Sequence, residues 1–152
     1  MRRALPLAII ILLLAVAAPP LPAQPVKVIY RAGGANDNIA WSPDGTKLAA
    51  EYCVLDKNGK PLWIMEEPTG EILAIAWSPD GTRLAAGSAD NKVYVYDQQG
   101  NLLWSYETGS VYAVDWSPDG SKLAAGSRGG GVYVFDQSGK PIWSYETGSS
   151  VY

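Results

Sequence analysis

Short runs of alternating apolar and polar residues fill most of this chain, and glycine, proline, aspartate and serine bound each run. Such runs are typical of short antiparallel β-strands joined by tight turns. The clearest stretch predicts four strands, at residues 71–77, 83–87, 92–97 and 102–107. No long helical period occurs beyond the first residues, so the sequence predicts an all-β fold.

The four-strand pattern is repeated along the chain. The motif Trp-Ser-Pro-Asp-Gly occurs three times, with starts 36 and 39 residues apart, and residues 77–110 match residues 116–149 at 23 of 34 positions. A fixed period of this length indicates stacked copies of one supersecondary unit. The copies lie at approximately 36–70, 71–109 and 110–148, and 149–152 starts a further copy. The first copy is shortened in its second hairpin.

The repeated motif is explained as a structural device. Serine first, proline second and glycine fourth are the preferences of a type I turn, and the preceding tryptophan ends a strand. The same explanation covers the Asp-x-x-Gly turns that begin at Asp56, Asp97 and Asp136. The repeat positions assigned to turns and first strands are Trp41, Pro43, Asp44, Gly45, Trp77, Pro79, Asp80, Gly81, Trp116, Pro118, Asp119 and Gly120.

A meander of four strands cannot cover its own two faces, so neighbouring copies are expected to stack face to face as the blades of a β-propeller. Tryptophans in the predicted fourth strands, Trp63, Trp104 and Trp143, are expected to pack between blades. Closed propellers have four to eight blades. About three blades therefore predict an incomplete, open arc. We expect either a fragment of a longer repeat protein, which we favour, or a ring completed by several chains.

Residues 110–136 resemble the WD-repeat family of β-propellers. The resemblance rests on Val111, Val114 and Trp116, on the turn 117–120, and on the segments 123–127 and 132–136. Phe135 stands where that family usually has tryptophan. The family often opens a repeat with Gly-His, whereas this chain contains no histidine. The resemblance implies a propeller without the side-chain network that many members build around that histidine.

The second half of each copy is similar to the repeat of pyrroloquinoline-quinone-type propellers. Residues 93–104 carry this likeness, because an Asp-x-x-Gly turn precedes Trp104. The resemblance implies that this tryptophan docks onto the next blade. Both subfamilies remain open on the sequence alone.

The first 23 residues are interpreted as a secretory signal peptide. Arg2 and Arg3 precede an apolar run of about 15 residues, which is short for a membrane span, and a small-residue exit follows. Cleavage is expected after Ala23, with Ala17 or Ala18 as alternatives. A retained membrane anchor is the alternative to cleavage. The sequence thus predicts a secreted or extracytoplasmic protein whose remaining residues, 24–152, form the partial propeller.

The amino-acid composition limits the kinds of partner and catalytic site that this chain can have. Loss of Arg2 and Arg3 would change the formal net charge from −3 to −5, which argues against a nucleic-acid partner. The absence of histidine removes histidine-based nucleophile pairs and most zinc sites. Cys53, the single cysteine, is expected to be a buried thiol rather than half of a disulfide between chains. No catalytic residue, cofactor or metal site is predicted.

One repeated segment is a candidate binding surface. Tyr106 and Glu107, with their counterparts Tyr145 and Glu146, could present an aromatic and acidic stripe to a peptide or a sugar. The favoured alternative is that a solvated outer strand simply carries polar residues.

The leading hypothesis is a non-catalytic propeller scaffold for protein–protein interaction. Carbohydrate or surface binding is the alternative. A quinone-dependent dehydrogenase is disfavoured, because such enzymes use a full ring of blades and only three copies are present here.

Overall fold

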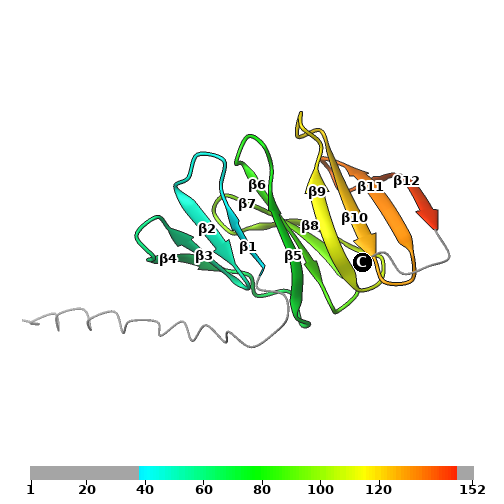
Figure 1. The fold of residues 1–152 in the computed structure, drawn as a ribbon, viewed down its shortest axis with the longest axis horizontal. Helices are drawn as coiled ribbons and strands as arrows, with labels where there is room; N and C mark the ends of the chain where they lie inside the picture. Colours follow the sequence, from blue (N-terminus) through cyan, green and yellow to red (C-terminus); the bar gives the residue numbers. More distant parts are fainter. Residues whose placement is uncertain (1–37, 147–152) are drawn as a thin grey trace, which may run out of the picture.

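The computed structural model describes residues 38–146, which form twelve β-strands and no helix (Figure 1). The strands make three separate sheets of four. We call these sheets blade 1, blade 2 and blade 3. Blade 1 contains β1 (Ile39–Trp41), β2 (Lys47–Ala50), β3 (Cys53–Asp56) and β4 (Pro61–Ile64). Blade 2 contains β5 (Ile72–Trp77), β6 (Arg83–Ser88), β7 (Lys92–Asp97) and β8 (Leu102–Glu107). Blade 3 contains β9 (Val111–Trp116), β10 (Lys122–Ser127), β11 (Gly131–Asp136) and β12 (Pro141–Glu146).

Every blade is an antiparallel meander whose strand order follows the sequence. The first strands lie side by side along the row, because β5 contacts both β1 and β9. The blades form a row rather than a closed ring (Figure 1). The structure therefore confirms the all-β class and the open arc of three blades. The expected signal peptide at 1–23 and the start of a further copy at 149–152 lie outside the described residues.

Blade 1 is shorter than the others at one end. Its strands β2 and β3 have four residues, whereas β6 and β7 have six, and only Glu51 and Tyr52 join them. Glu51 adopts a positive φ of 50°, which is uncommon for a residue with a side chain. The second hairpin of blade 1 is thus shortened, as the sequence predicts.

The outer strand of each blade contains one extra residue that interrupts the pairing register. In blade 2, Val95 pairs with Trp104 but Tyr96 pairs with Leu102, which leaves Leu103 without an opposite residue. Leu62 and Ile142 hold the same position in the other blades. These three side chains are exposed to a similar extent, 45–48%. Such bulges protect an edge strand from pairing with other chains.

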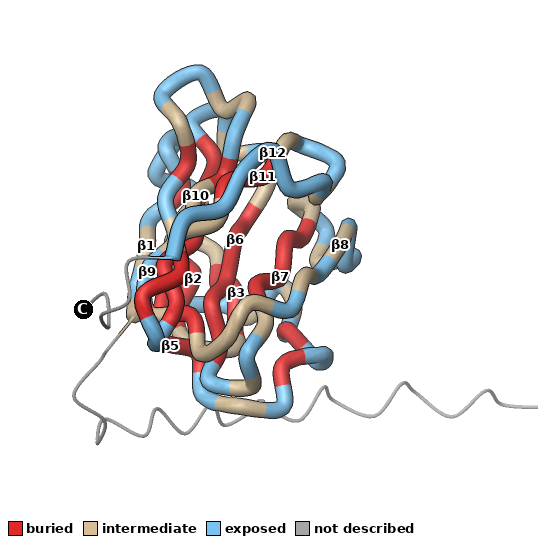
Figure 2. Tube along the Cα trace, turned by 90° about the vertical axis from the view of Figure 1, so that its right-hand side faces the viewer, coloured by how far each residue is buried: buried red, intermediate tan, exposed pale blue. Residues whose placement is uncertain are grey.

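The core lies between the blades rather than within them. One apolar cluster joins blade 1 to blade 2, and a second joins blade 2 to blade 3. The middle strands β6 and β7 are buried over most of their length (Figure 2). Because strand side chains alternate between faces, each blade offers one row of residues to the preceding blade and another to the following blade.

These rows follow the pairing register. The tail row of a blade faces the following blade, and the head row faces the preceding blade. The tail rows are Ala40–Ala49–Val54–Trp63, Ala76–Ala85–Val95–Trp104 and Asp115–Ala124–Val134–Trp143. The head rows are Trp41–Leu48–Leu55–Pro61, Trp77–Leu84–Tyr96–Leu102 and Trp116–Leu123–Phe135–Pro141. Each internal contact is one tail row against one head row.

Candidate functional site

The Ser-Pro-Asp-Gly turns have the same geometry in all three blades. Gly45 donates its N–H to the carbonyl oxygen of Ser42 at 2.8 Å, which closes the turn. Asp44 accepts bonds from the Ser42 hydroxyl at 2.6 Å and from the Thr46 N–H at 3.0 Å. Asp80 and Asp119 accept the equivalent bonds at the same distances.

These bonds set the charge state of the turn carboxylates. The Ser42 hydroxyl, followed by the N–H and hydroxyl of Thr46, lowers the pKa of Asp44 from 3.8 to about 2. The equivalent donors, which are the residues two before and two after the aspartate, lower the pKa values of Asp80 and Asp119. Each carboxylate is thus ionised at neutral pH and engaged inside its own turn, which suits a structural role better than proton transfer.

The Asp-x-x-Gly turns form docking platforms for the preceding blade. Trp63 lies across Gly100, where an added Cβ would stand 2.6 Å from the ring, and its Nε1 donates to the carbonyl oxygen of Gln98 at 3.1 Å. Trp104 lies across Gly139 in the same way and donates to the carbonyl oxygen of Gln137 at 3.3 Å. Glycine is required there because a side chain would occupy the space of the indole ring.

The first-strand tryptophans make a second contact in the opposite direction. Trp77 donates its Nε1 proton to the carbonyl oxygen of Ala40 at 3.1 Å, and Trp116 donates to that of Ala76 at 3.2 Å. Both rings are buried, at 8% and 6% exposure. The tryptophans of first and fourth strands therefore bind neighbouring blades from both sides.

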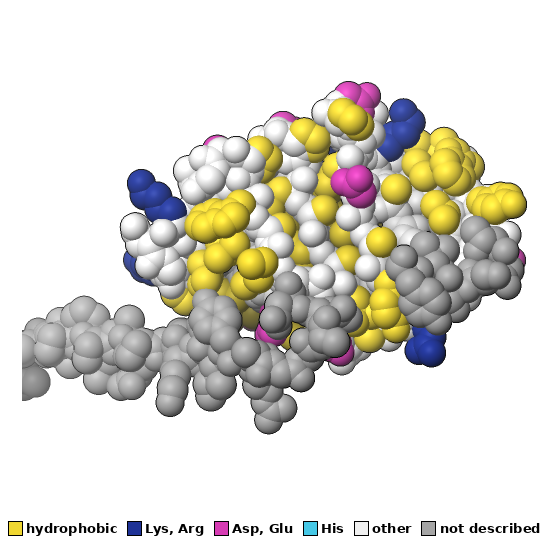
Figure 3. All heavy atoms as spheres, viewed as in Figure 1, with side chains coloured by type: hydrophobic (Ala, Val, Ile, Leu, Met, Phe, Trp, Pro, Cys, Tyr) yellow, Lys and Arg dark blue, Asp and Glu magenta, His cyan; other side chains and the backbone are white. Residues whose placement is uncertain are grey.

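The outer ends of the row leave the same contacts unmade within the described residues. Trp41 and Trp143 are 56% and 52% exposed. The neighbouring apolar residues of the blade 1 head row are less exposed, because Leu48 is half-buried and Leu55 is buried. Gly59, which corresponds to Gly100 and Gly139, has open space where a Cβ would stand. Clusters of hydrophobic side chains lie over blade 1 and over blade 3 in Figure 3.

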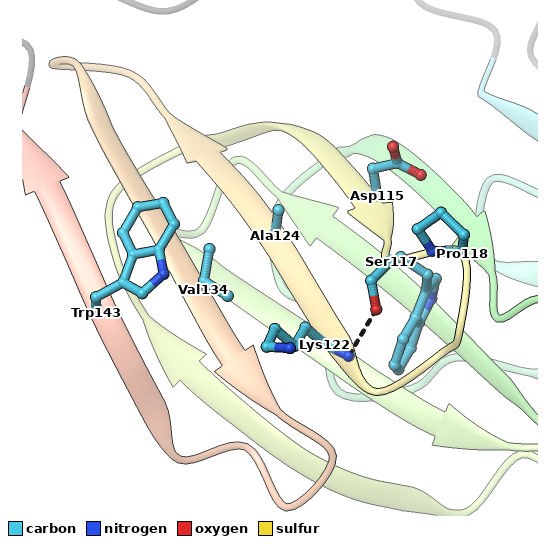
Figure 4. A pocket seen from close by; sticks show the side chains of 8 residues that line it. Asp115, Ser117, Pro118, Lys122, Ala124, Val134 and Trp143 are labelled. Carbon is cyan, nitrogen blue, oxygen red and sulfur yellow. Dashed lines mark hydrogen bonds between the residues drawn. The ribbon is translucent and has the colours of Figure 1, made fainter.

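The open side of blade 3 forms a hollow of about 330 Å³. Its floor is the apolar part of the tail row, with Trp143, Val134 and Ala124 side by side across three strands (Figure 4). Lys122 and the turn that follows Trp116 border it. The corresponding residues of blade 2, Ala85 and Val95, are fully buried by blade 3. The hollow lies on the side of blade 3 that corresponds to the covered side of blade 2, although Val134 in its floor is only 7% exposed.

The candidate stripe of tyrosines and glutamates is not one continuous surface. Tyr106 packs into the cluster between blades 2 and 3, with its ring centroid 5.0 Å from that of Phe135. Its counterpart Tyr145 is 63% exposed. Glu107 and Glu146 are both exposed. Within residues 38–146, the two tyrosines differ because only Tyr106 has a following blade to cover it.

A carboxylate missed at the sequence level organises the opposite end of blade 2. Asp90 accepts bonds at 2.8 Å from the Thr69 N–H and from the Tyr94 hydroxyl. Burial raises the pKa of Asp90, but these bonds outweigh it and the pKa lies below its ordinary value. Burial and the bond to Asp90 raise the pKa of Tyr94. Aligning the copies with one another does not reveal Asp90, because Gly129 stands at the same position in blade 3.

The described residues contain little else with the character of a chemical centre. Cys53 is buried, as the sequence predicts, and burial raises the pKa of its thiol. Residues 38–146 contain no cluster of acidic or cysteine side chains arranged to hold a metal ion. Within the same range, no helix is long and apolar enough to cross a membrane.

Comparisons with known proteins agree with this architecture. A family model described as "WD domain, G-beta repeat" matches residues 59–97 and 100–136, which together are half of the chain. No curated protein sequence gives a significant match. Among solved structures, 1051 chains match significantly. One belongs to a structure titled "Crystal Structure of Mitotic Checkpoint Complex", with a TM-score of 0.68 and 21% identity. That match covers 74% of this chain but only 40% of the other, so the likeness concerns the fold of a part.

Proposed function

This chain belongs to the WD40-repeat family of β-propellers, and from that premise we propose that it is a non-catalytic scaffold that binds a protein partner outside the cytoplasm. The family fold suggests a protein-interaction scaffold. The turn carboxylates, which are the most regular polar groups of the chain, are already engaged in local hydrogen bonds. The proposal is therefore that the protein acts by binding a partner at its surface.

The two ends of the blades differ in how strictly their turns are repeated, and this observation carries the proposal. At one end, the turns Ser-Pro-Asp-Gly and Asp-x-x-Gly recur in every blade. At the other end, the turns between second and third strands are Glu51–Tyr52, then residues 89–91, then residues 128–130. Loops that vary on a constant framework are where specificity normally resides. We assign partner binding to this variable end.

The location outside the cytoplasm rests on the sequence of residues 1–23. Their basic start, short apolar run and small-residue exit support export, with a retained anchor as the alternative. N-terminal sequencing of the protein recovered from the extracellular or periplasmic fraction tests this part, and a start near Gln24 is expected. Recovery of the chain only from the cytoplasm would contradict it.

A matched pair of charge reversals tests partner binding. Arg128 is exposed in the variable turn of blade 3, and Lys140 is exposed directly after the Asp-x-x-Gly turn at the other end. Arg128→Glu is expected to reduce capture of a specific envelope polypeptide about ten-fold, whereas Lys140→Glu is expected to leave it unchanged. The measurement is affinity capture from an envelope extract, quantified against the unaltered chain. Equal capture by all three proteins would contradict the assignment to the variable end.

Carbohydrate binding is a second candidate, because Trp41, Trp143 and Tyr145 are exposed aromatic side chains. A glycan array separates the two candidates. Specific glycan retention that is lost in Tyr145→Ala would favour this candidate over a protein partner.

A further inference from the structure

Asn58 is the only asparagine in the sequence that is followed by a glycine. It lies in the Asp-x-x-Gly turn between β3 and β4, and it is exposed. Because glycine has no side chain, its backbone nitrogen can approach the side-chain carbonyl carbon of the preceding asparagine closely. We infer that Asn58 is a site of spontaneous deamidation and isomerisation in the folded protein.

The reaction needs only water and proceeds through a cyclic imide. The backbone nitrogen of Gly59 forms a bond to Cγ of Asn58, and the bond from Cγ to Nδ2 breaks. Nδ2 leaves as ammonia and takes with it the proton that the Gly59 nitrogen gives up. Water then opens the ring at one of its two carbonyl carbons. Opening at Cγ gives aspartate, and opening at the backbone carbon gives isoaspartate, whose main chain continues through Cγ.

The hydrogen bonds of the turn oppose this attack until the turn opens. The Gly59 N–H donates to the carbonyl oxygen of Asp56 at 2.9 Å. Asp56 Oδ1 accepts bonds from the N–H groups of Asn58 at 2.8 Å and Lys60 at 2.9 Å. Residues 57–60 are exposed and none belongs to an apolar cluster, so this turn can open without disturbing the core. We expect the folded chain to react about ten-fold more slowly than the unfolded chain, since a net hydrogen bond contributes about that factor.

The position remains exposed when a neighbouring blade docks on the turn. Gln99 and Ser138 stand where blade 1 has Asn58, and both of their turns receive a tryptophan from the preceding blade. Gln99 and Ser138 are exposed all the same. The access of water to Asn58 therefore does not depend on what lies against Gly59.

Two other exposed asparagines lie beside turns of blade 2 but lack a following glycine. Leucine follows Asn101, whose Nδ2 donates to Asp97 Oδ2 at 2.8 Å. Lysine follows Asn91, whose Oδ1 accepts a bond from the Ser110 hydroxyl at 3.1 Å. A side chain on the following residue hinders closure of the imide ring. These two asparagines are therefore internal controls for Asn58.

The two products change the turn to different degrees. Aspartate at position 58 adds a second carboxylate beside Asp56 but leaves the main chain unaltered. Isoaspartate adds a carbon atom to the main chain of the turn, which displaces the N–H groups that Asp56 holds. The amide of Lys60 is therefore expected to exchange its hydrogen faster in the isoaspartate form than in the unmodified chain.

Incubation of the full chain under native conditions, followed by cleavage after glutamate and mass spectrometry, tests the inference. Residues 52–66 form one peptide, and residues 72–107, which include Asn91 and Asn101, form another. Peptide 52–66 is expected to gain the mass difference between an amino and a hydroxyl group, and fragmentation is expected to find both isoaspartate and aspartate at position 58. Peptide 72–107 is expected to convert about ten-fold more slowly, which corresponds to a barrier higher by about 1.4 kcal/mol.

The variant Asn58→Gln is the matched control. It places in blade 1 the residue that blade 2 has at Gln99, so the turn is expected to keep its hydrogen bonds. A glutamine would have to form a larger ring in the same reaction, so peptide 52–66 of this variant is expected to keep its mass over the same period.

Three results would overturn the inference. Peptide 52–66 could keep its mass under native conditions for a period in which the chain unfolded in urea reacts completely, and the folded turn would then prevent the attack. Equal conversion at Asn58 and Asn101 would show that the following glycine does not set the rate. Aspartate without any isoaspartate would mean direct hydrolysis of the side-chain amide instead of a cyclic imide.

Discussion

Trp104 and Trp143 occupy identical Trp-Ser-Tyr-Glu segments in blades 2 and 3, yet their surroundings differ. Trp104 packs over Gly139 and against Phe135, with ring centroids 5.4 Å apart. Trp143 is 52% exposed beside the hollow on blade 3. The difference lies in the neighbouring blade and not in the segment. In a repeat protein, burial is a property of the contact between units.

The Ser-Pro-Asp-Gly turns, in contrast, have the same hydrogen bonds in every blade. Asp44 and Asp119 accept bonds of equal length, although one lies in the first described blade and the other in the last. Every donor comes from within two residues of the aspartate. The turn chemistry is local, so it is complete whether or not another blade follows. Local and inter-blade features are expected to respond differently to the same kinds of substitution.

The tryptophan pair gives the largest expected difference. Trp104→Ala is expected to lower the free energy of unfolding by about 3–5 kcal/mol, because it empties the platform on Gly139 and removes a ring from the cluster between blades 2 and 3. Trp143→Ala is expected to cost under about 1 kcal/mol, since Trp143 is already 52% exposed. Chemical denaturation at low protein concentration measures both values. Equal losses would show that the blade contact contributes little to stability.

The glycines of the Asp-x-x-Gly turns allow the same comparison on the surface that receives the tryptophan. Gly100 and Gly59 have similar backbone angles, with φ of 89° and 81°, so an alanine strains both alike. Only at Gly100 would the new Cβ meet an indole ring, at 2.6 Å from Trp63. Gly100→Ala is expected to cost about 1–3 kcal/mol more of the free energy of unfolding than Gly59→Ala. Denaturation of the two variants side by side is the measurement, and equal midpoints would refute the docking of Trp63 on Gly100.

Sequence reasoning predicted the features that repeat locally. Alternation and turn residues placed the strands of blade 2 to within about one residue of β5 to β8. The same reasoning assigned Asp44, Asp80 and Asp119 to turns. It also predicted that the fourth-strand tryptophans pack between blades, but it did not identify Gly100 and Gly139 as the surfaces that receive Trp63 and Trp104.

The remaining features depend on which blade covers which face. The sequence offers Tyr106 as part of an exposed stripe, but blade 3 packs against it. Tyr145, with the same local sequence, has no such cover among the described residues. Asp90 occurs in one copy alone, so repetition did not mark it. Residue spacing gives the period and the alternation of faces, whereas packing partners come from the order of blades in space.

The smallest expected effect comes from the turn carboxylates. It tests whether the hydrogen bonds inside the turns are independent of the neighbouring blades. The pKa of Asp44 is lowered from 3.8 to about 2, so its stabilising effect is complete above its ordinary pKa and is lost as the pH falls toward about 2. Asp44→Asn is expected to flatten the dependence of unfolding free energy on pH between about 4 and 2 relative to the unaltered chain. Asp119→Asn should do the same to a similar extent, because its donors are equivalent. Urea denaturation at stepped pH values measures the two slopes. If Asp44→Asn flattened the slope and Asp119→Asn did not, the turn chemistry would depend on the neighbouring blades after all.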